Sequence, residues 1–214
     1  NACLGFLNAM HLAATMIDAG RIEYALIVDG EGARHTHEVT LDRLSRPETT
    51  RADVVEQFAT LTLGSGAAAM VLGRAADHPQ GHRFLGGVTR AATEHHLLCV
   101  GDLESMRTDA RGLLNAGVAL GTALWRAAAD EFDWTDMDRY VAHQVSQMHT
   151  RAMIKALRVD PDRVPLTFPT RGNMGPAAVP FTLATQVDSL HSGDRVLLLG
   201  IGSGLNASFA EVVW

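Results

Sequence analysis

The segment that most constrains the fold is residues 3–19, an apolar stretch with helical spacing whose only charged side chain is Asp18. Its apolar residues recur every three to four positions and so share one face: Leu4, Leu7, Met10, Ala14 and Ile17. Further apolar residues widen that face. A helix this poor in charge is typical of one buried on most sides. We therefore expect other elements to cover it on more than one side.

Short apolar runs alternate with helical patterns along the rest of the chain. The runs at residues 24–28 and 67–72 are typical of strands covered on both faces, as in parallel sheets. Residues 140–142 and 206–214 also read as strands. Helices are expected over residues 113–132 and 146–157, the second with Ser146 as its N-cap. This alternation predicts the α/β class.

Two further patterns bear on organisation. Residues 75–83 are polar with Pro and Gly and form the best candidate boundary, while residues 35–57 are polar and read as an irregular surface excursion. When the sequence is aligned with itself at a shift of 172 residues, Asn1 aligns with Asn173 and Gly30 with Gly202. Both segments then have the same order of elements: an asparagine, an apolar helix, a tight turn, an apolar strand and a glycine-rich stretch. A duplication would imply two pseudo-symmetric halves that meet at a central site.

Composition excludes several classes of protein. The 214 residues are 47% hydrophobic and 20% charged with a net charge of −6, which argues for a packed core and against a nucleic-acid binder. Two cysteines make no disulfide framework, so we expect a reducing, cytoplasmic location. No apolar run is long enough to span a membrane. The histidine pairs at 35/37 and 95/96 lack partners at metal-ligand spacing, so we expect no metal.

Cys3 lies where the first helix should begin. Free backbone N–H groups and the helix dipole at that end favour a thiolate, which would lower the thiol pKa, and the same groups could hold an oxyanion. The alternative is a small buried side chain, which is also the expectation for Cys99.

Three other positions could contribute to a site. His143 ends a strand, where α/β proteins place functional groups, although a structural histidine is equally compatible. Asn173 lies in a turn before a helix and could simply be a cap. The glycine-rich stretch 200–204 brings backbone close to any occupant. Because a strand pattern follows it, a dinucleotide-binding loop, which should open a helix, is disfavoured.

These residues, in this order, resemble the ketoacyl synthase III branch of the thiolase superfamily over essentially the whole chain. The matching motifs are Ala2-Cys3-Leu4-Gly5-Phe6, Ala142-His143-Gln144 and Gly172-Asn173-Met174-Gly175. Within that branch, the chain is most similar to the OleA-type synthases, which join two fatty acyl-CoA molecules head to head. The segments that carry this closer match are residues 1–4, 28–31, 61–64, 86–90 and 200–206. The resemblance implies a layered α-β-α-β-α fold with duplicated halves, here divided into residues 1–80 and 81–214.

The resemblance also implies a mechanism. Cys3 would be acylated, with the oxyanion on the backbone N–H groups of Cys3 and Ser203, and His143 and Asn173 would stabilise the enolate of a second acyl-CoA. The product would be a β-keto acid in an olefin or β-lactone pathway. Coenzyme A thioesters are the substrates, and no cofactor is needed. Apolar helices near Cys3 would line acyl channels, with Phe6, Leu7 and Met10 as candidates that could equally be plain core.

In these synthases a sizeable portion precedes the nucleophile, so we expect that portion to be missing here. In the OleA type a glutamate from it, reaching across the dimer, is the base. We therefore expect a partner segment or chain that supplies this glutamate, in a homo- or heterodimer. Alternatives are a decarboxylating acyl-ACP synthase, a thiolase proper, which would need a second cysteine near the C-terminus, and a partly structural subunit of a heterodimer.

Overall fold

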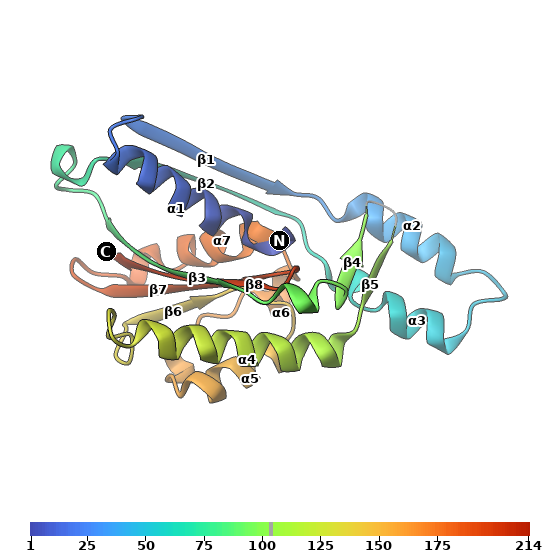
Figure 1. The fold of residues 1–214 in the computed structure, drawn as a ribbon. Coiled ribbons are helices and arrows are strands. Elements are labelled where there is room, and N and C mark those ends of the chain that lie inside the picture. Colours follow the sequence, from blue (N-terminus) through green and yellow to red (C-terminus); the bar gives the residue numbers. More distant parts are fainter. Residues whose placement is uncertain (103–104) are drawn as a thin grey trace.

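In the computed structural model, which describes residues 1–102 and 105–214, four layers stack in the order sheet, helices, sheet, helices (Figure 1). The first sheet pairs β1 (Tyr24–Glu31) with β2 (Gly66–Gly73), and the second has the order β3-β8-β7-β6. Helices α1 (Gly5–Asp18) and α7 (Ala178–Ala184) lie between the sheets, and α4 (Ala110–Ala128) and α5 (Gln147–Leu157) cover the far side. The predicted α/β class is confirmed.

The second sheet forms the centre of the molecule. Its strands are β3 (Arg83–Ala91), β6 (Arg139–Ala142), β7 (Arg195–Gly202) and β8 (Asn206–Val213). Strands β6 and β7 run parallel, whereas β8 is antiparallel to both β7 and β3. Alternate residues of β7 pack on opposite sides: Leu198 joins the core around α1, and Leu199 joins the core under α4. The strand is therefore buried on both faces, as a continuous apolar run indicates.

The prediction that residues 24–28 form a strand covered on both faces is wrong for the described residues. Strand β1 is antiparallel to β2, and its side chains are alternately exposed. The open face carries Leu26 at 68% exposure, Val28 at 66% and Val71 of β2 at 67%. The opposite face carries Ile27, which packs into the core around α1. An apolar run therefore marked the strand but not its burial, because only one layer covers it here.

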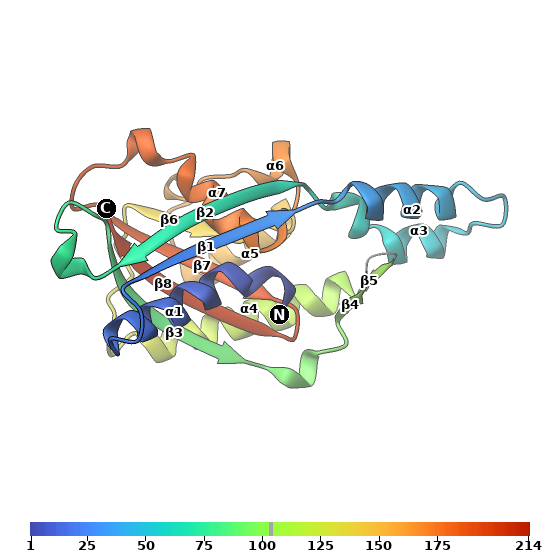
Figure 2. The same ribbon diagram turned by 90° about the horizontal axis from the view of Figure 1, so that it is seen from above.

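Residues 35–57 are not irregular, as the polar sequence suggested. They form α2 (Arg34–Leu44) and α3 (Arg51–Gln57), which project from the body beside β4 (Cys99–Gly101) and β5 (Met106–Thr108) (Figure 2). A capping box begins α3: the Thr50 side chain accepts from the Asp53 N–H, and the Asp53 carboxylate accepts from the Thr50 N–H. This Thr-x-x-Asp signal stabilises a helix with little apolar character.

The remaining helices follow the sequence closely. Asp109 caps α4, so the helix begins three residues before the predicted start and ends at Ala128 rather than 132. Ser146 caps α5 as predicted, accepting from the His149 N–H. Helix α6 spans Phe168–Arg171.

Strand β3, which follows residue 80, joins the second sheet. The division of the chain into residues 1–80 and 81–214 stays a prediction. No helix among the described residues is long and apolar enough to cross a membrane.

Candidate active site

Cys3 lies in a short 3-10 helix, Ala2–Leu4, that leads directly into α1. The neighbouring Leu4 packs against the end of β7, where a Cβ on Gly200 would lie 2.4 Å from the Leu4 Cδ1 atom. A side chain at this position would have to push aside the ends of the Leu4 and Leu7 side chains. The glycine therefore allows the chain segment with Cys3 to rest on the end of the central strand.

Ser203 stands beside the same segment, in the turn between β7 and β8. Its hydroxyl oxygen accepts from the Ala2 N–H at 3.3 Å. The residues on the N-terminal side of Cys3 are thus tied to the glycine-rich turn. The structure therefore places Ser203 beside the residue that precedes Cys3, and the oxyanion role of the Cys3 and Ser203 backbone N–H groups stays a prediction.

Asn173 is held by its backbone. Its N–H donates to the Thr62 carbonyl at 2.9 Å, and its carbonyl accepts from the Gly64 N–H at 2.7 Å. The side-chain Oδ1 accepts from the Gly175 N–H at 3.0 Å, which leaves the Nδ2 group as the donor available to a ligand. The following turn, Gly175–Ala177, packs against the 3-10 helix of Cys3.

His143 follows β6 directly, and its N–H donates to the Leu199 carbonyl of β7 at 2.8 Å. The side chain is 8% exposed, and neither ring nitrogen has a hydrogen-bond partner among the described residues. Burial, with a smaller contribution from His149, lowers its pKa to about 4. A neutral imidazole with two free buried nitrogens is poised to bind a ligand, because leaving such atoms unpaired is costly.

The electrostatics of Cys3 differ from the sequence expectation. Burial raises the pKa of the thiol to about 12, and Cys99 and Glu31 also raise it. The expectation of a lowered thiol pKa is therefore wrong for this structure. Loss of water around the sulphur outweighs the favourable helix end, so the resting side chain is a neutral thiol.

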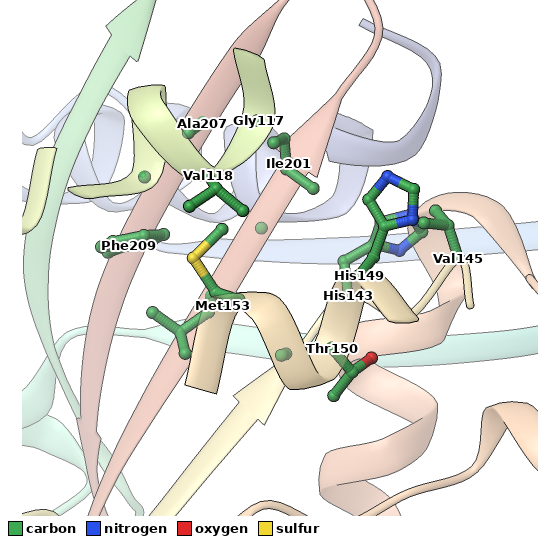
Figure 3. Close-up of a pocket in the computed structure, with 14 residues that line it drawn as sticks. Gly117, Val118, His143, Val145, His149, Thr150, Met153, Ile201, Ala207 and Phe209 are labelled. Atoms are coloured by element: carbon green, nitrogen blue, oxygen red, sulfur yellow. The ribbon is translucent and has the colours of Figure 1, made fainter. Parts of the chain in front are cut away.

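A cavity of about 50 Å³ lies next to His143 between α4, α5 and the central sheet (Figure 3). His143, His149 and Thr150 give it a polar end, and Val118, Met153, Ile201 and Phe209 give it apolar walls. Gly117 and Gly121 of α4 also line it, so the helix backbone approaches the cavity closely.

Phe6, Leu7 and Met10 do not line this cavity. They are 3%, 2% and 1% exposed and belong to the core that packs α1 between the sheets. The sequence analysis did not single out the residues that do form the cavity. One signal was present: Gly117 and Gly121, four positions apart in the predicted helix, lie on one face and leave space beside it.

No cluster of three or more potential metal ligands occurs in residues 1–102 and 105–214.

The arrangement of two sheets around paired inner helices, with Cys3, Ser203 and Asn173 on adjoining segments, defines the thiolase fold.

Comparison with known proteins places the chain within that fold. Residues 1–93 match the model of 3-oxoacyl-[acyl-carrier-protein] synthase III, and residues 127–214 match the model of its C-terminal domain. The chain therefore belongs to the ketoacyl synthase III family, in the thiolase superfamily.

Two curated relatives carry the name acyl-CoA:acyl-CoA alkyltransferase. One, from Xanthomonas campestris, is 48% identical over 218 residues that include 100% of this chain and 64% of the relative. The other, from Shewanella oneidensis, is 34% identical and is covered to 66% by this whole chain. The chain thus spans slightly less than two thirds of each relative's length.

Solved structures agree. The structure of a Cys-to-Ser variant of Xanthomonas campestris OleA with bound lauric acid and lauroyl-CoA has a TM-score of 0.97 and 47% identity to this chain. The match includes 100% of the present chain and 65% of the OleA chain.

Proposed function

We propose that this protein is an acyltransferase that condenses two fatty acyl-CoA molecules without decarboxylation and forms a β-keto acid. The observation that carries the proposal is His143: a neutral, buried imidazole with two unpaired nitrogens, at the polar end of an otherwise apolar cavity. A thioester has this combination of one polar carbonyl and a long apolar chain. The two curated alkyltransferase relatives support the same activity.

In the first half-reaction the Cys3 sulphur attacks the carbonyl carbon of one acyl-CoA. The new bond to Cys3 replaces the bond to the coenzyme A sulphur, and coenzyme A leaves as a thiol with the proton that Cys3 loses. Because the resting thiol has a pKa of about 12, deprotonation must accompany the attack. The backbone N–H groups of Cys3 and Ser203 hold the oxyanion, and one such donor contributes about 10²–10³ in rate.

In the second half-reaction a second acyl-CoA loses a proton from the carbon next to its carbonyl. The N–H donors of His143 and Asn173 stabilise the enolate oxygen, and the enolate carbon attacks the acyl group on Cys3. The Cys3 sulphur leaves and regains a proton, and water then releases coenzyme A and the β-keto acid. In this proposal the base is a glutamate outside these 214 residues.

Product analysis tests the proposal and separates it from its main rival. Given a long-chain acyl-CoA alone, the protein should release coenzyme A and form a ketone derived from two acyl chains after loss of CO2 from the β-keto acid. A decarboxylating acyl-ACP synthase would instead need a malonyl partner. Product that appears only when malonyl-ACP is added would refute the proposal in favour of that rival. A role in an olefin or a β-lactone pathway depends on what consumes the β-keto acid.

We also propose that another polypeptide segment covers the open face of β1 and β2, in a cytoplasmic homo- or heterodimer. Leu26, Val28 and Val71 together expose apolar surface on that face, and burying each such side chain is worth about 1.5–3 kcal/mol. Leu26→Asp should therefore weaken association in size-exclusion chromatography. Val187→Asp, at a 47% exposed site elsewhere, is the matched control. Equal elution of both variants and the parent protein would contradict the idea.

A further inference from the structure

Glu31 is the last residue of β1, the strand that returns beside α1. The chain runs along α1, turns, and comes back along β1 in the opposite direction, so that β1 ends on the side where α1 begins (Figure 1 and Figure 2). The 14 residues of α1 cover about 21 Å and the 8 residues of β1 cover about 26 Å. Glu31 therefore lies at the level of the segment that contains Cys3. Neither half-reaction described above uses its side chain.

The side chain of Glu31 points into the molecule. Side chains alternate along β1, and Glu31 shares the inward face of the strand with Ile27 and Asp29. A Cβ on Gly175 would lie 3.2 Å from the Glu31 Cδ atom and 3.4 Å from its Oε2 atom, so the carboxyl group lies over the backbone of that glycine. The turn that begins at Gly175 also packs against the 3-10 helix of Cys3. Glu31 and Cys3 thus adjoin the same turn.

The Glu31 carboxyl group has no cation beside it. Among the described residues it makes no hydrogen bond or ion pair, and neither β2 nor the turn at Gly175 carries a titratable side chain. Helix α1 carries only His11 and, at its far end, Asp18. The charged group that acts on Glu31 is Asp29 of the same strand. The carboxylate is therefore free to accept a proton.

The Cys3 thiol needs an acceptor for its proton, because its pKa is about 12. The negative charge of Glu31 contributes to that raised pKa, so the carboxyl group and the thiol interact. His143 is a weak base with a pKa of about 4, whereas burial and Asp29 raise the pKa of Glu31 above its usual range. Because a group with a higher pKa accepts a proton more readily, Glu31 is the better acceptor of the two.

We propose that Glu31 is the general base of the first half-reaction and accepts the Cys3 proton while the sulphur attacks the thioester. This inference rests on the proposed function, since it adds the proton transfer to the same acylation step. As the bond between the Cys3 sulphur and the carbonyl carbon forms, the proton moves from that sulphur to a Glu31 oxygen. The tetrahedral intermediate then collapses, the bond to the coenzyme A sulphur breaks, and that sulphur takes the proton from Glu31. Glu31 is a carboxylate again, and coenzyme A leaves as a thiol.

The rate of acylation tests the inference, measured on the assembled protein as the burst of coenzyme A released from a long-chain acyl-CoA. Glu31→Gln keeps the size of the side chain but cannot accept the proton, so acylation should slow by about 100-fold. Glu23→Gln is the matched control, because Glu23 is exposed just before the same strand, and it should be acylated at the parent rate. An unchanged acylation rate in Glu31→Gln would overturn the inference.

The pH dependence of the acylation rate distinguishes a base from a structural role. In the parent protein the rate should rise with pH as Glu31 ionises. Asp29→Asn removes the charge that raises the pKa of Glu31, so the midpoint of this rise should move to lower pH. The same midpoint in Asp29→Asn and the parent protein, or the same rise in Glu31→Gln, would refute the inference.

Product analysis keeps this inference separate from the proposed function, because acylation of Cys3 precedes condensation with either kind of second substrate. Slow acylation in Glu31→Gln, together with product that forms only when malonyl-ACP is added, would support the role of Glu31 and refute only the acyl-CoA condensation. Parent-like acylation in Glu31→Gln, together with ketone from acyl-CoA alone, would refute only the role of Glu31.

Discussion

Gly121 should set the length of the acyl chain that the cavity accepts. A Cβ at this position would lie 2.8 Å from the Met153 Cε atom and 3.6 Å from the Phe209 Cζ atom. Both are ends of side chains that can move, so Gly121→Ala should fold, with Met153 displaced into the cavity. Replacing a helical glycine by alanine also favours the helix by about 1 kcal/mol, which offsets the crowding.

The size of the effect follows from the space that is lost. The added methyl group takes the place of about one methylene of substrate, and one buried methylene is worth about 0.8 kcal/mol. That difference corresponds to about a fourfold change in binding. The kcat/KM for the longest good substrate should fall about fourfold, while that for a chain two carbons shorter should change less than twofold.

The assay is competition among acyl-CoA substrates of increasing chain length, with ketone products resolved by mass spectrometry. Ala119→Ser is the matched control, because Ala119 is exposed on the same helix. The reasoning is refuted if Gly121→Ala keeps the parent chain-length profile, or if Ala119→Ser shifts it equally.

Three further outcomes are expected. His143→Ala and Asn173→Asp should still be acylated in a coenzyme A release burst but should form no ketone, and equal loss of both steps would contradict the proposed division of labour. The pKa of His143 is about 4 in the folded protein and 6.5 in the unfolded chain, so the unfolded chain binds a proton more readily. The free energy of unfolding should therefore fall by about 3 kcal/mol as the pH drops from 6.5 to 4. In urea unfolding, the dependence of the unfolding free energy on pH should be weaker in His143→Gln than in the parent protein. An equal pH dependence in both proteins would contradict this prediction. Glu211, 2% exposed, accepts from Trp134 Nε1 at 2.9 Å and pairs with Arg195, so Glu211→Ala should cost about 3–5 kcal/mol in the same assay, and a loss below 1 kcal/mol would contradict the burial argument.

Much of the secondary structure could be predicted from local sequence patterns. The strand before His143, the Ser146 cap and the two strands that flank the glycine-rich turn could all be predicted, because each depends on neighbouring residues in the sequence. A helical start near Cys3 could be predicted for the same reason, although the structure has a short 3-10 helix there and α1 begins at Gly5.

Features that depend on distant residues were not readable. The cavity combines Gly121, His149 and Phe209 from three elements, and no local pattern shows that these elements meet. The raised pKa of Cys3 also follows from surroundings that span the chain, since burial there outweighs the helix end. Strand β1 shows the converse: its apolar run predicted cover on both faces, but cover comes from neighbouring layers, not from the strand.

The most direct test of the account is the site of acylation. The assembled protein should be incubated with a long-chain acyl-CoA, digested, and its peptides examined by mass spectrometry. The adduct should lie on the peptide that contains Cys3, should persist in Cys99→Ala, and should disappear in Cys3→Ala together with ketone formation. An adduct on Cys99 instead, or ketone still formed by Cys3→Ala, would contradict the central claim that Cys3 carries the acyl group.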